Sequence, residues 1–75
     1  MEQEHHTIKL TDGNEFIPLD KLLKLARVVG SGGEAHAAIQ EGMVTVNGAV
    51  ELQKRKKIRA GDVAEFNGES IKVEA

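Results

Sequence analysis

The sequence predicts an α+β fold in which two short helices pack on a small antiparallel β-sheet. Apolar residues recur with the period of an amphipathic helix over residues 19–28 and again over residues 32–41. From Met43 onward they alternate with a period of two, and two Asn-Gly pairs follow, each typical of a tight hairpin turn. We therefore expect one domain spanning residues 1–75, with a sheet built largely from residues 43–74.

The first elements are a short strand and a helix. Polar and apolar residues alternate over Thr7–Leu10, and the turn-forming pair Asp12-Gly13 is expected to end this strand. Pro18 pre-sets the backbone for a helical start. The apolar stripe of the helix has the spacing i, i+3, i+4, i+7 and consists of Leu19, Leu22, Leu23 and Ala26. Gly30 is expected to end the helix.

The second helix has a start signal and a stop signal. In Ser31-Gly32-Gly33-Glu34 the serine hydroxyl can accept from the backbone N–H of Glu34, while the glutamate side chain reaches back, as in a capping box. Gly42 is expected to be the left-handed residue after the helix. The helix is expected to bury Ala35, Ala38 and Ile39.

The C-terminal half predicts hairpins. Val44 and Val46 lie on one face of a strand that Asn47-Gly48 ends. Asn67-Gly68 repeats the turn signal between the strands Val63–Phe66 and Ser70–Val73. The expected core is Leu22, Leu23, Ala35, Ala38, Ile39, Val44, Val46, Val63, Ile71 and Val73.

Size and composition exclude several classes of protein. A chain of 75 residues buries only about 60% of its unfolded surface, which disfavours a deep substrate cleft. The absence of cysteine excludes disulfides, thiolate metal sites and thiol nucleophiles. There is no Ser/His/Asp arrangement, and His5 and His6 form at most a weak pair on a loose end, so we expect no enzyme, cofactor or metal. Residues 1–6 lack the apolar run of a signal peptide, and no segment has the roughly 20 apolar residues of a membrane span, so we expect a cytoplasmic protein.

The charge is distributed unevenly. The net charge is −2, but residues 17–60 carry eight Lys or Arg against four acids, and the remaining residues carry two Lys against eight acids. The distribution of charge, more than its sum, sets the field that a polyanion meets. The middle of the chain is therefore the candidate surface for an anionic partner.

The strongest candidate for that surface is Lys54–Lys57, four cations in succession, with Arg59 beyond. Clustered cations suit a nucleic-acid backbone, because each phosphate contact releases condensed counterions. The alternative is a solubilising loop, or an edge strand that is charged to prevent aggregation.

The helices supply further candidates. The turn residues Ser31, Gly32 and Gly33 precede a helix whose free N–H groups and dipole favour anions, although a tight turn needs glycine in any case. No G-x-x-x-x-G-K pattern is present, so this turn is not a nucleotide-binding loop.

Side chains on both helices extend this set. Lys21, Lys24 and Arg27 lie on the first helix, where simple solvation explains any one of them alone. His36 and Gln40 share one face of the second helix, and either contact with phosphate, ribose or a base edge or plain exposure accounts for them.

Five short motifs together resemble a known family, and the resemblance covers about Phe16 to Phe66. They are Leu19–Leu23, Ser31, Glu34-Ala35, Gly42–Gly48 and Gly61–Val63. In this order and spacing they resemble the αL motif of the S4 (S-four) RNA-binding domain, and the Ser-Gly-Gly turn is similar to that of a bacterial subgroup of small stand-alone members. The resemblance implies two helices against an antiparallel sheet, with a positive groove for structured ribosomal or transfer RNA.

The resemblance also implies which residues contact RNA. Carried over by position, they are Lys21, Lys24, Ser31, Gly32, Gly33, His36, Gln40, Lys54, Arg55, Lys56 and Lys57. Many members have an arginine after the turn serine where this chain has Gly32-Gly33, and His36 replaces a frequent cation. We therefore expect lower affinity or a greater dependence on Lys54–Lys57.

We expect a monomeric, non-enzymatic RNA-binding module, with ribosomal subunits among its partners. Phe16 and Phe66 are the only aromatic residues, which favours recognition of folded RNA by shape over stacking of single-stranded bases. The alternative is a protein-interaction adaptor that keeps the fold without binding RNA, suggested by the acidic flanks and the missing turn arginine.

Overall fold

A computed structural model describes residues 4–11 and 13–75 of the chain. Its helices and strands, in chain order, are β1 (Glu4–Lys9), β2 (Ile17–Pro18), α1 (Leu19–Leu25), α2 (Gly32–Gln40), β3 (Val44–Val46), β4 (Ala49–Val50), β5 (Lys57–Ile58), β6 (Val63–Phe66) and β7 (Glu69–Glu74).

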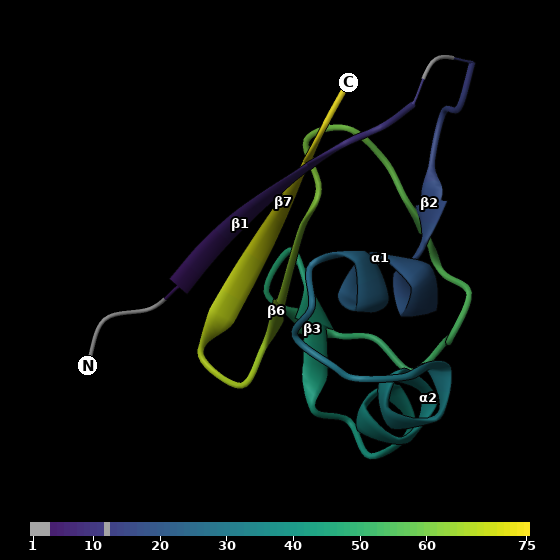
Figure 1. Cartoon of the computed structure of the whole chain (residues 1–75). Coiled ribbons are helices and arrows are strands. Elements are labelled where there is room, and N and C mark those ends of the chain that lie inside the picture. The colour runs from purple at the N-terminus through teal and green to yellow at the C-terminus, as the bar shows by residue number, and fades with distance from the viewer. Residues whose placement is uncertain (1–3, 12) are drawn as a thin grey trace.

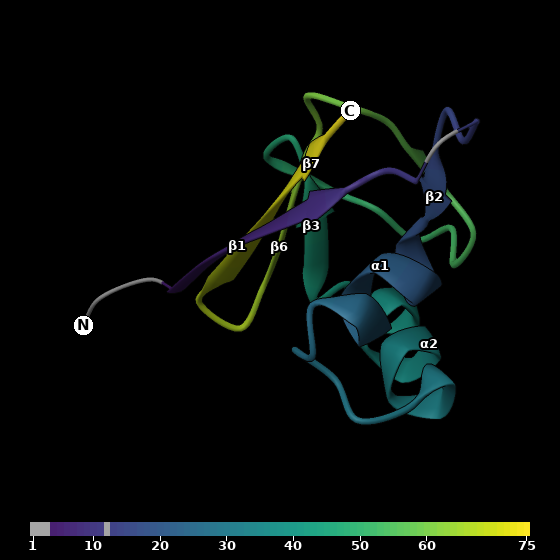
Figure 2. The ribbon, with the colours of Figure 1, turned by 45° about the horizontal axis from the view of Figure 1, so that its top comes forward.

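The strands form two sheets (Figure 1). The larger has five strands in the order β1-β7-β6-β3-β4, and the smaller pairs β2 with β5. The two helices lie together on one side of the larger sheet, as both ribbon views show (Figures 1 and 2). The predicted α+β class, with two short helices on small sheets, is confirmed.

The larger sheet is mixed, which corrects the expectation of an antiparallel sheet. β1 runs parallel to β7, with Ile8 opposite Val73, while the other pairs in this sheet are antiparallel. The alternation over Thr7–Leu10 predicted a strand, but a parallel partner far along the chain leaves no local signal. Gly13 has a φ of +83°, as a turn requires, and its predicted turn partner Asp12 lies outside the described residues.

The predicted hairpin turns are confirmed by the backbone angles. Asn47 and Gly48 have φ values of +52° and +86°, and Asn67 and Gly68 have +52° and +81°. A type I′ turn needs positive φ at both central residues, which asparagine and glycine tolerate best. Gly42, at +74°, is the expected left-handed residue after α2.

The first helix is shorter than predicted. α1 ends at Leu25 rather than at residue 28, because Arg27 adopts a left-handed φ of +59° and turns the chain before Gly30 is reached. Val28 and Val29 still pack against the core from outside the helix, which explains why the apolar pattern continued beyond its end. α2 ends at Gln40, one residue earlier than expected.

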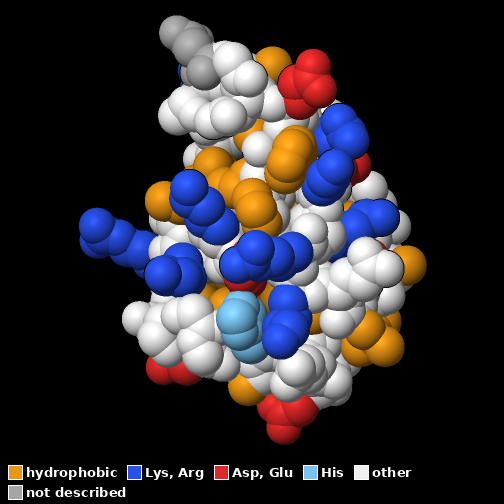
Figure 3. Space-filling model, turned by 90° about the vertical axis from the view of Figure 1, so that its right-hand side faces the viewer, with side chains coloured by type: hydrophobic (Ala, Val, Ile, Leu, Met, Phe, Trp, Pro, Cys, Tyr) orange, Lys and Arg blue, Asp and Glu red, His pale blue; other side chains and the backbone are white. Residues whose placement is uncertain are grey.

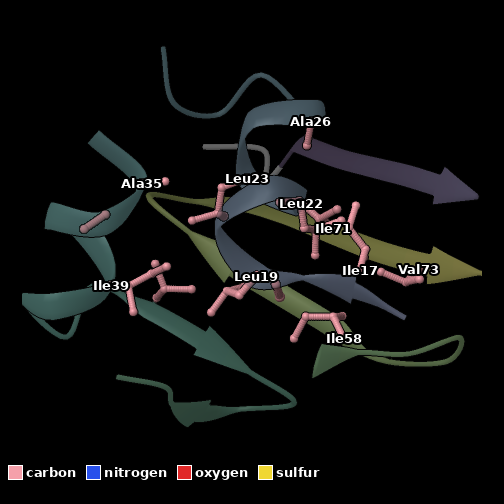
Figure 4. Packing of buried hydrophobic residues seen from close by; sticks show 13 residues of the cluster. Ile17, Leu19, Leu22, Leu23, Ala26, Ala35, Ile39, Ile58, Ile71 and Val73 are labelled. Atoms are coloured by element: carbon pink, nitrogen blue, oxygen red, sulfur yellow. The ribbon is translucent and has the colours of Figure 1, made fainter. Parts of the chain in front are cut away.

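The core joins both helices to both sheets (Figure 4). Its buried hydrophobic residues are Ile17, Leu19, Leu22, Leu23, Ala26, Ala35, Ala38, Ile39, Val44, Ile58, Ala64, Ile71 and Val73. Of the ten predicted core residues, Val46 and Val63 are only half-buried, which corrects that part of the prediction. Five further residues are buried but were not among those ten: Ile17, Leu19, Ala26, Ile58 and Ala64. Leu19 and Ala26 belong to the predicted apolar stripe of the first helix, while Ile17 and Ile58 lie in two-residue strands that are too short to show a period.

Candidate nucleic-acid interface

The segment Lys54–Lys57, called the basic loop below, is attached to the first turn of α1 through its backbone. The N–H of Leu19 donates to the carbonyl of Lys56 at 2.9 Å, and the N–H of Asp20 donates to the carbonyl of Lys54 at 3.0 Å. The residue before the helix is a proline that provides no side-chain cap, so the loop carbonyls satisfy donors that a helix start otherwise leaves free. The loop is thus held by its backbone, and its four residues stay exposed.

An open hollow of about 430 Å³, called the groove below, lies where α1, α2 and the basic loop meet. It is lined by Pro18, Asp20, Lys21, Lys24, Gly32, His36 and Arg55. Figure 3 shows Lys and Arg side chains gathered around a histidine on one face of the molecule. Cations from α1 and from the basic loop therefore face one space, which raises the local potential for an anion.

One acid lies among these cations. Oδ2 of Asp20 accepts a hydrogen bond from Nε2 of His36 at 2.9 Å, and Oδ1 accepts from the N–H of Lys21 at 2.8 Å. Burial favours the neutral acid, but these hydrogen bonds and the charges of His36 and Arg55 outweigh it and hold the pKa of Asp20 below its ordinary value. Asp20 therefore stays ionised and fixes the orientation of the His36 ring. Nδ1 of that ring has no hydrogen-bond partner among the residues described.

Two backbone N–H groups at the start of α2 donate hydrogen bonds to side chains of the same segment. Oγ of Ser31 accepts from the N–H of Glu34 at 3.2 Å, which confirms the serine half of the capping box. The Glu34 carboxylate, however, accepts from the N–H of Gly30 at 3.0 Å instead of that of Ser31. The carboxylate of Glu34 therefore lies at the turn.

The groove has room for a small side chain at Gly32. A Cβ added there would lie 4.0 Å from Cδ of Lys24, which is an ordinary contact.

The groove brings together five of the eleven residues predicted to contact RNA: Lys21, Lys24, Gly32, His36 and Arg55. Ser31 and Gly33 are exposed and do not line it, and the remaining loop residues Lys54, Lys56 and Lys57 are exposed as well. Gln40 is exposed at the C-terminal end of α2 and does not line the groove. Gln40 lies one turn along α2 from His36, but only His36 lines the groove.

Comparison with known proteins identifies the family. The sequence profile of the S4 domain matches residues 8–74. This chain belongs to the S4 domain family. The motif resemblance that predicted this membership is confirmed.

Two bacterial relatives have most of their length matched by this S4 domain. YbcJ of Escherichia coli (strain K12) is 49% identical over 59 residues, covering 79% of this chain and 84% of YbcJ. RlbA of Bacillus subtilis (strain 168), named a probable ribosome maturation protein, is 41% identical over 54 residues, covering 72% of this chain and 76% of RlbA. The solution structure of E. coli YbcJ, described as revealing an αL motif involved in RNA binding, matches with a TM-score of 0.71 and 45% identity. That match covers 92% of this chain and 86% of YbcJ.

Part of the S4 motif serves the fold, in a set of contacts called the clamp below. Nδ2 of Asn47 donates to Oδ1 of Asp62 at 3.0 Å, and Oδ1 of Asn47 accepts from the N–H of Val63 at 3.0 Å. Oδ2 of Asp62 accepts from the N–H of Arg59 at 2.8 Å. The Arg59 N–H, the Asn47 amide and the charges of Lys56 and Arg59 outweigh the effect of burial and hold the pKa of Asp62 below its ordinary value. The clamp thus ties two turns together.

Phe16 is the residue of this S4 domain that sequence reasoning missed. It is 37% exposed, and Nζ of Lys57 lies 5.0 Å from the centre of its ring, within the range of a cation–π interaction. The antiparallel pairing of β2 with β5 brings these two residues together. No local pattern in the sequence indicates that pairing, so Phe16 was noted only as one of two aromatic residues.

The remaining predictions concern metals and membranes. His5 and His6 lie in β1 rather than on a loose end, with Nδ1 of His5 2.5 Å from Oγ of Ser70 and Nε2 of His6 3.1 Å from Oε1 of Glu69. Within residues 4–11 and 13–75, no group of three or more His, Cys, Asp or Glu side chains is arranged to hold a metal ion. Neither helix in this part of the chain is long and apolar enough to cross a membrane.

Proposed function

We propose that this S4 domain is a non-enzymatic module that binds structured RNA, with ribosomal RNA in the ribosomal subunits or their precursors as its target. The observation that carries the proposal is the groove, where Lys21 and Lys24 of α1 meet Arg55 of the basic loop. None of these three cations forms an ion pair with another described residue. Their charges therefore stay available for phosphates.

The arrangement suits folded RNA. Structured RNA is recognised mostly through its shape and through phosphate and 2′-hydroxyl contacts, which need cations held at fixed spacings. The backbone hydrogen bonds from Leu19 and Asp20 to the basic loop supply that rigidity. The description of the YbcJ structure, which refers to RNA binding, and the name of RlbA, which refers to ribosome maturation, support the same partner.

A filter-binding series tests this proposal. The protein is titrated with a ribosomal RNA fragment, a transfer RNA and a DNA duplex of equal length at several salt concentrations. We expect both RNAs to bind more tightly than the DNA, with a log affinity that falls linearly with log salt. If no RNA binds at low salt while a protein partner co-purifies, the chain is an adaptor and the proposal is wrong.

A matched pair of variants tests the place of binding. Arg55→Gln removes a cation from the groove, and Lys72→Gln removes one from β7, where Lys72 lines a separate hollow with His5 and His6. We expect Arg55→Gln to weaken binding and to lower the salt slope by roughly 0.7 to 0.9, the value of one phosphate contact. Lys72→Gln should leave both unchanged. Equal effects of the two variants would contradict the groove as the binding surface.

A further inference from the structure

A second hollow, of about 320 Å³, adjoins the groove. Its lining includes the apolar residues Leu10, Phe16, Ile17, Pro18 and Leu25 and the cations Lys9 and Lys21. Its volume is at the small end of the range of about 300–1,000 Å³ that is typical of ligand sites, so it suits a small flat group better than a folded segment. In Figure 3, hydrophobic side chains lie among the cations on the same face as the histidine.

Two apolar side chains of this hollow, those of Phe16 and Leu25, lie outside the core, whereas Ile17 belongs to the core and Leu10 packs against it. Phe16 is 37% exposed and Leu25 is 52% exposed, and neither belongs to the buried cluster or packs against it as Val28 and Val29 do. Exposed apolar surface gathered in one hollow marks a site of contact more often than apolar residues scattered singly.

The charges around the hollow select an anionic partner. Lys57 holds its ammonium over the Phe16 ring, and Lys9 and Lys21 are part of the lining. None of the described residues that line it is acidic. An apolar hollow with a cationic rim suits a ligand that carries a flat apolar group next to negative charge.

The hollow adjoins the groove, because Pro18 and Lys21 line both. A phosphate held by Lys21 would therefore place the neighbouring nucleotide at the mouth of the hollow. Bases inside a duplex are stacked and paired, so only an unpaired base can leave the helix and enter. We propose that this hollow binds one unpaired base of the RNA that occupies the groove, an inference that rests on the proposed function.

The residues at the site define how the base is held. Phe16 lines the hollow and stays 37% exposed with Lys57 in place, and we assign its ring as the group on which the base stacks. The side-chain amide of Asn14 donates to the hydroxyl of Thr11 and leaves its carbonyl oxygen without a partner among the described residues. That oxygen is an acceptor for an N–H of the base edge. The preferred target is thus a paired stem with a bulged or terminal unpaired nucleotide.

The experiment compares three RNA hairpins with the same stem. One is fully paired, one has a single bulged adenosine, and one has an abasic nucleotide at the bulge, which keeps the phosphate and removes the base. We expect the adenosine bulge to bind about 5- to 140-fold more tightly than the abasic bulge, the range for stacking one base on an aromatic side chain. A 2-aminopurine at the bulge should lose fluorescence when the protein binds, which reports stacking directly.

Variants assign the effect to the hollow. Phe16→Ala should abolish the preference for the adenosine bulge over the abasic bulge. Its affinity for the paired hairpin and for the abasic hairpin should equal that of the wild type. Leu52→Ala, which truncates a side chain that is 60% exposed outside the hollow, is the matched control and should keep the preference. Phe16→Leu keeps an apolar side chain without the ring and should restore little of the preference for the adenosine bulge.

The outcomes separate the two proposals. If the wild-type protein binds all three hairpins equally, and 2-aminopurine fluorescence does not change, RNA binding stands and the base site is wrong. If it binds none of them at low salt, the proposed function fails as well. If Phe16→Ala instead abolishes capture of a protein partner, the hollow is a peptide site and the base inference is overturned.

Discussion

The groove and the clamp each contain one aspartate with a lowered pKa, and their surroundings differ. In the clamp, both Asp62 oxygens accept hydrogen bonds from the two turns that the residue joins. In the groove, both Asp20 oxygens are also bonded, but Lys21, Lys24 and Arg55 around them form no ion pair with the described residues.

The difference shows that a perturbed carboxylate does not by itself mark a binding site. Structural networks lower the pKa of an aspartate as effectively as functional ones do. The distinguishing property is where each aspartate lies. Lys56 and Arg59 near Asp62 form no ion pair with the described residues either, but the hydrogen bonds of Asp62 join two turns of the fold. Asp20 instead lines an open groove together with the cations of α1 and the basic loop.

The largest expected effect comes from neutralising the basic loop, by changing Lys54, Arg55, Lys56 and Lys57 to Gln together. Four charge contacts of about 0.7 kcal/mol each amount to a loss of RNA affinity on the order of 100-fold. The salt slope should fall by roughly 3. Filter binding over a salt series measures both.

Stability serves as the internal control for this variant. Unfolding in urea should change by about 1 kcal/mol or less, because the loop is attached through its backbone. The side-chain interactions lost are the Lys57–Phe16 contact and the weak attractions of Arg55 to Asp20 and of Lys56 to Asp62. An unchanged salt slope would mean that the cluster is a solvated edge and that the groove is wrongly assigned.

A variant of the clamp should lose stability and keep its RNA affinity, the reverse of the basic-loop variant. Asn47→Ala removes two side-chain hydrogen bonds and places a residue with a Cβ but no local hydrogen bond at φ +52°, so we expect a destabilisation of about 2 kcal/mol. RNA affinity of the folded protein should stay the same. Urea unfolding and filter binding test the two statements.

Asn47→Gly is the matched control for the backbone angle. It keeps the permitted conformation and loses only the hydrogen bonds, so it should cost less than Asn47→Ala. A clear loss of RNA affinity in either folded variant would place the clamp in the binding surface and remove the contrast with the groove.

A smaller effect is expected from the helix side of the groove. Changing Lys21 and Lys24 to Gln should weaken RNA binding about 10-fold and lower the salt slope by roughly 1.5, because two phosphate contacts are lost. The double variant Arg27→Gln, Lys72→Gln has the same net charge as the Lys21, Lys24 variant, changes residues that line neither the groove nor the second hollow, and should affect RNA binding less. If the two double variants were equivalent, net charge rather than the groove would control binding.

The smallest effect concerns pH. The folded-state pKa of Asp62 is lowered, so its contribution to stability is complete above the ordinary aspartate pKa of about 3.9 and is lost as pH falls through the lower folded value. Urea unfolding of Asp62→Asn should therefore show a smaller difference between pH 6 and pH 3 than the wild type. Asp20→Asn should behave similarly, because the pKa of Asp20 is lowered too.

RNA binding then separates the two aspartates. Asp20→Asn alters the charge of the groove and the anchor of His36, so it should change RNA affinity at neutral pH, while Asp62→Asn should not. Identical affinities for both variants would show that the position of Asp20 among the cations has no consequence for binding.

Local patterns predicted much of the fold because they depend on neighbouring residues. The period over α2, the serine cap and both Asn-Gly turns were predicted correctly, since caps and left-handed turns are set by the side chains at those positions. The end of α1 was not, because Val28 and Val29 continue an apolar pattern while packing from a non-helical segment. The cations of the candidate site could be named from the sequence, although Gln40 proved to lie outside the groove.

The sequence by itself determined which residues carry charge, where helices and hairpins start, and which family motif is present. Only the tertiary structure decided that β1 pairs with β7, that Asp20 holds His36, and that Phe16 lies under Lys57. These contacts join residues far apart in the chain, and the packing of the whole core determines which of them form. The local sequence around each residue does not specify these long-range contacts, so the groove and the neighbouring hollow could be identified only from the tertiary structure.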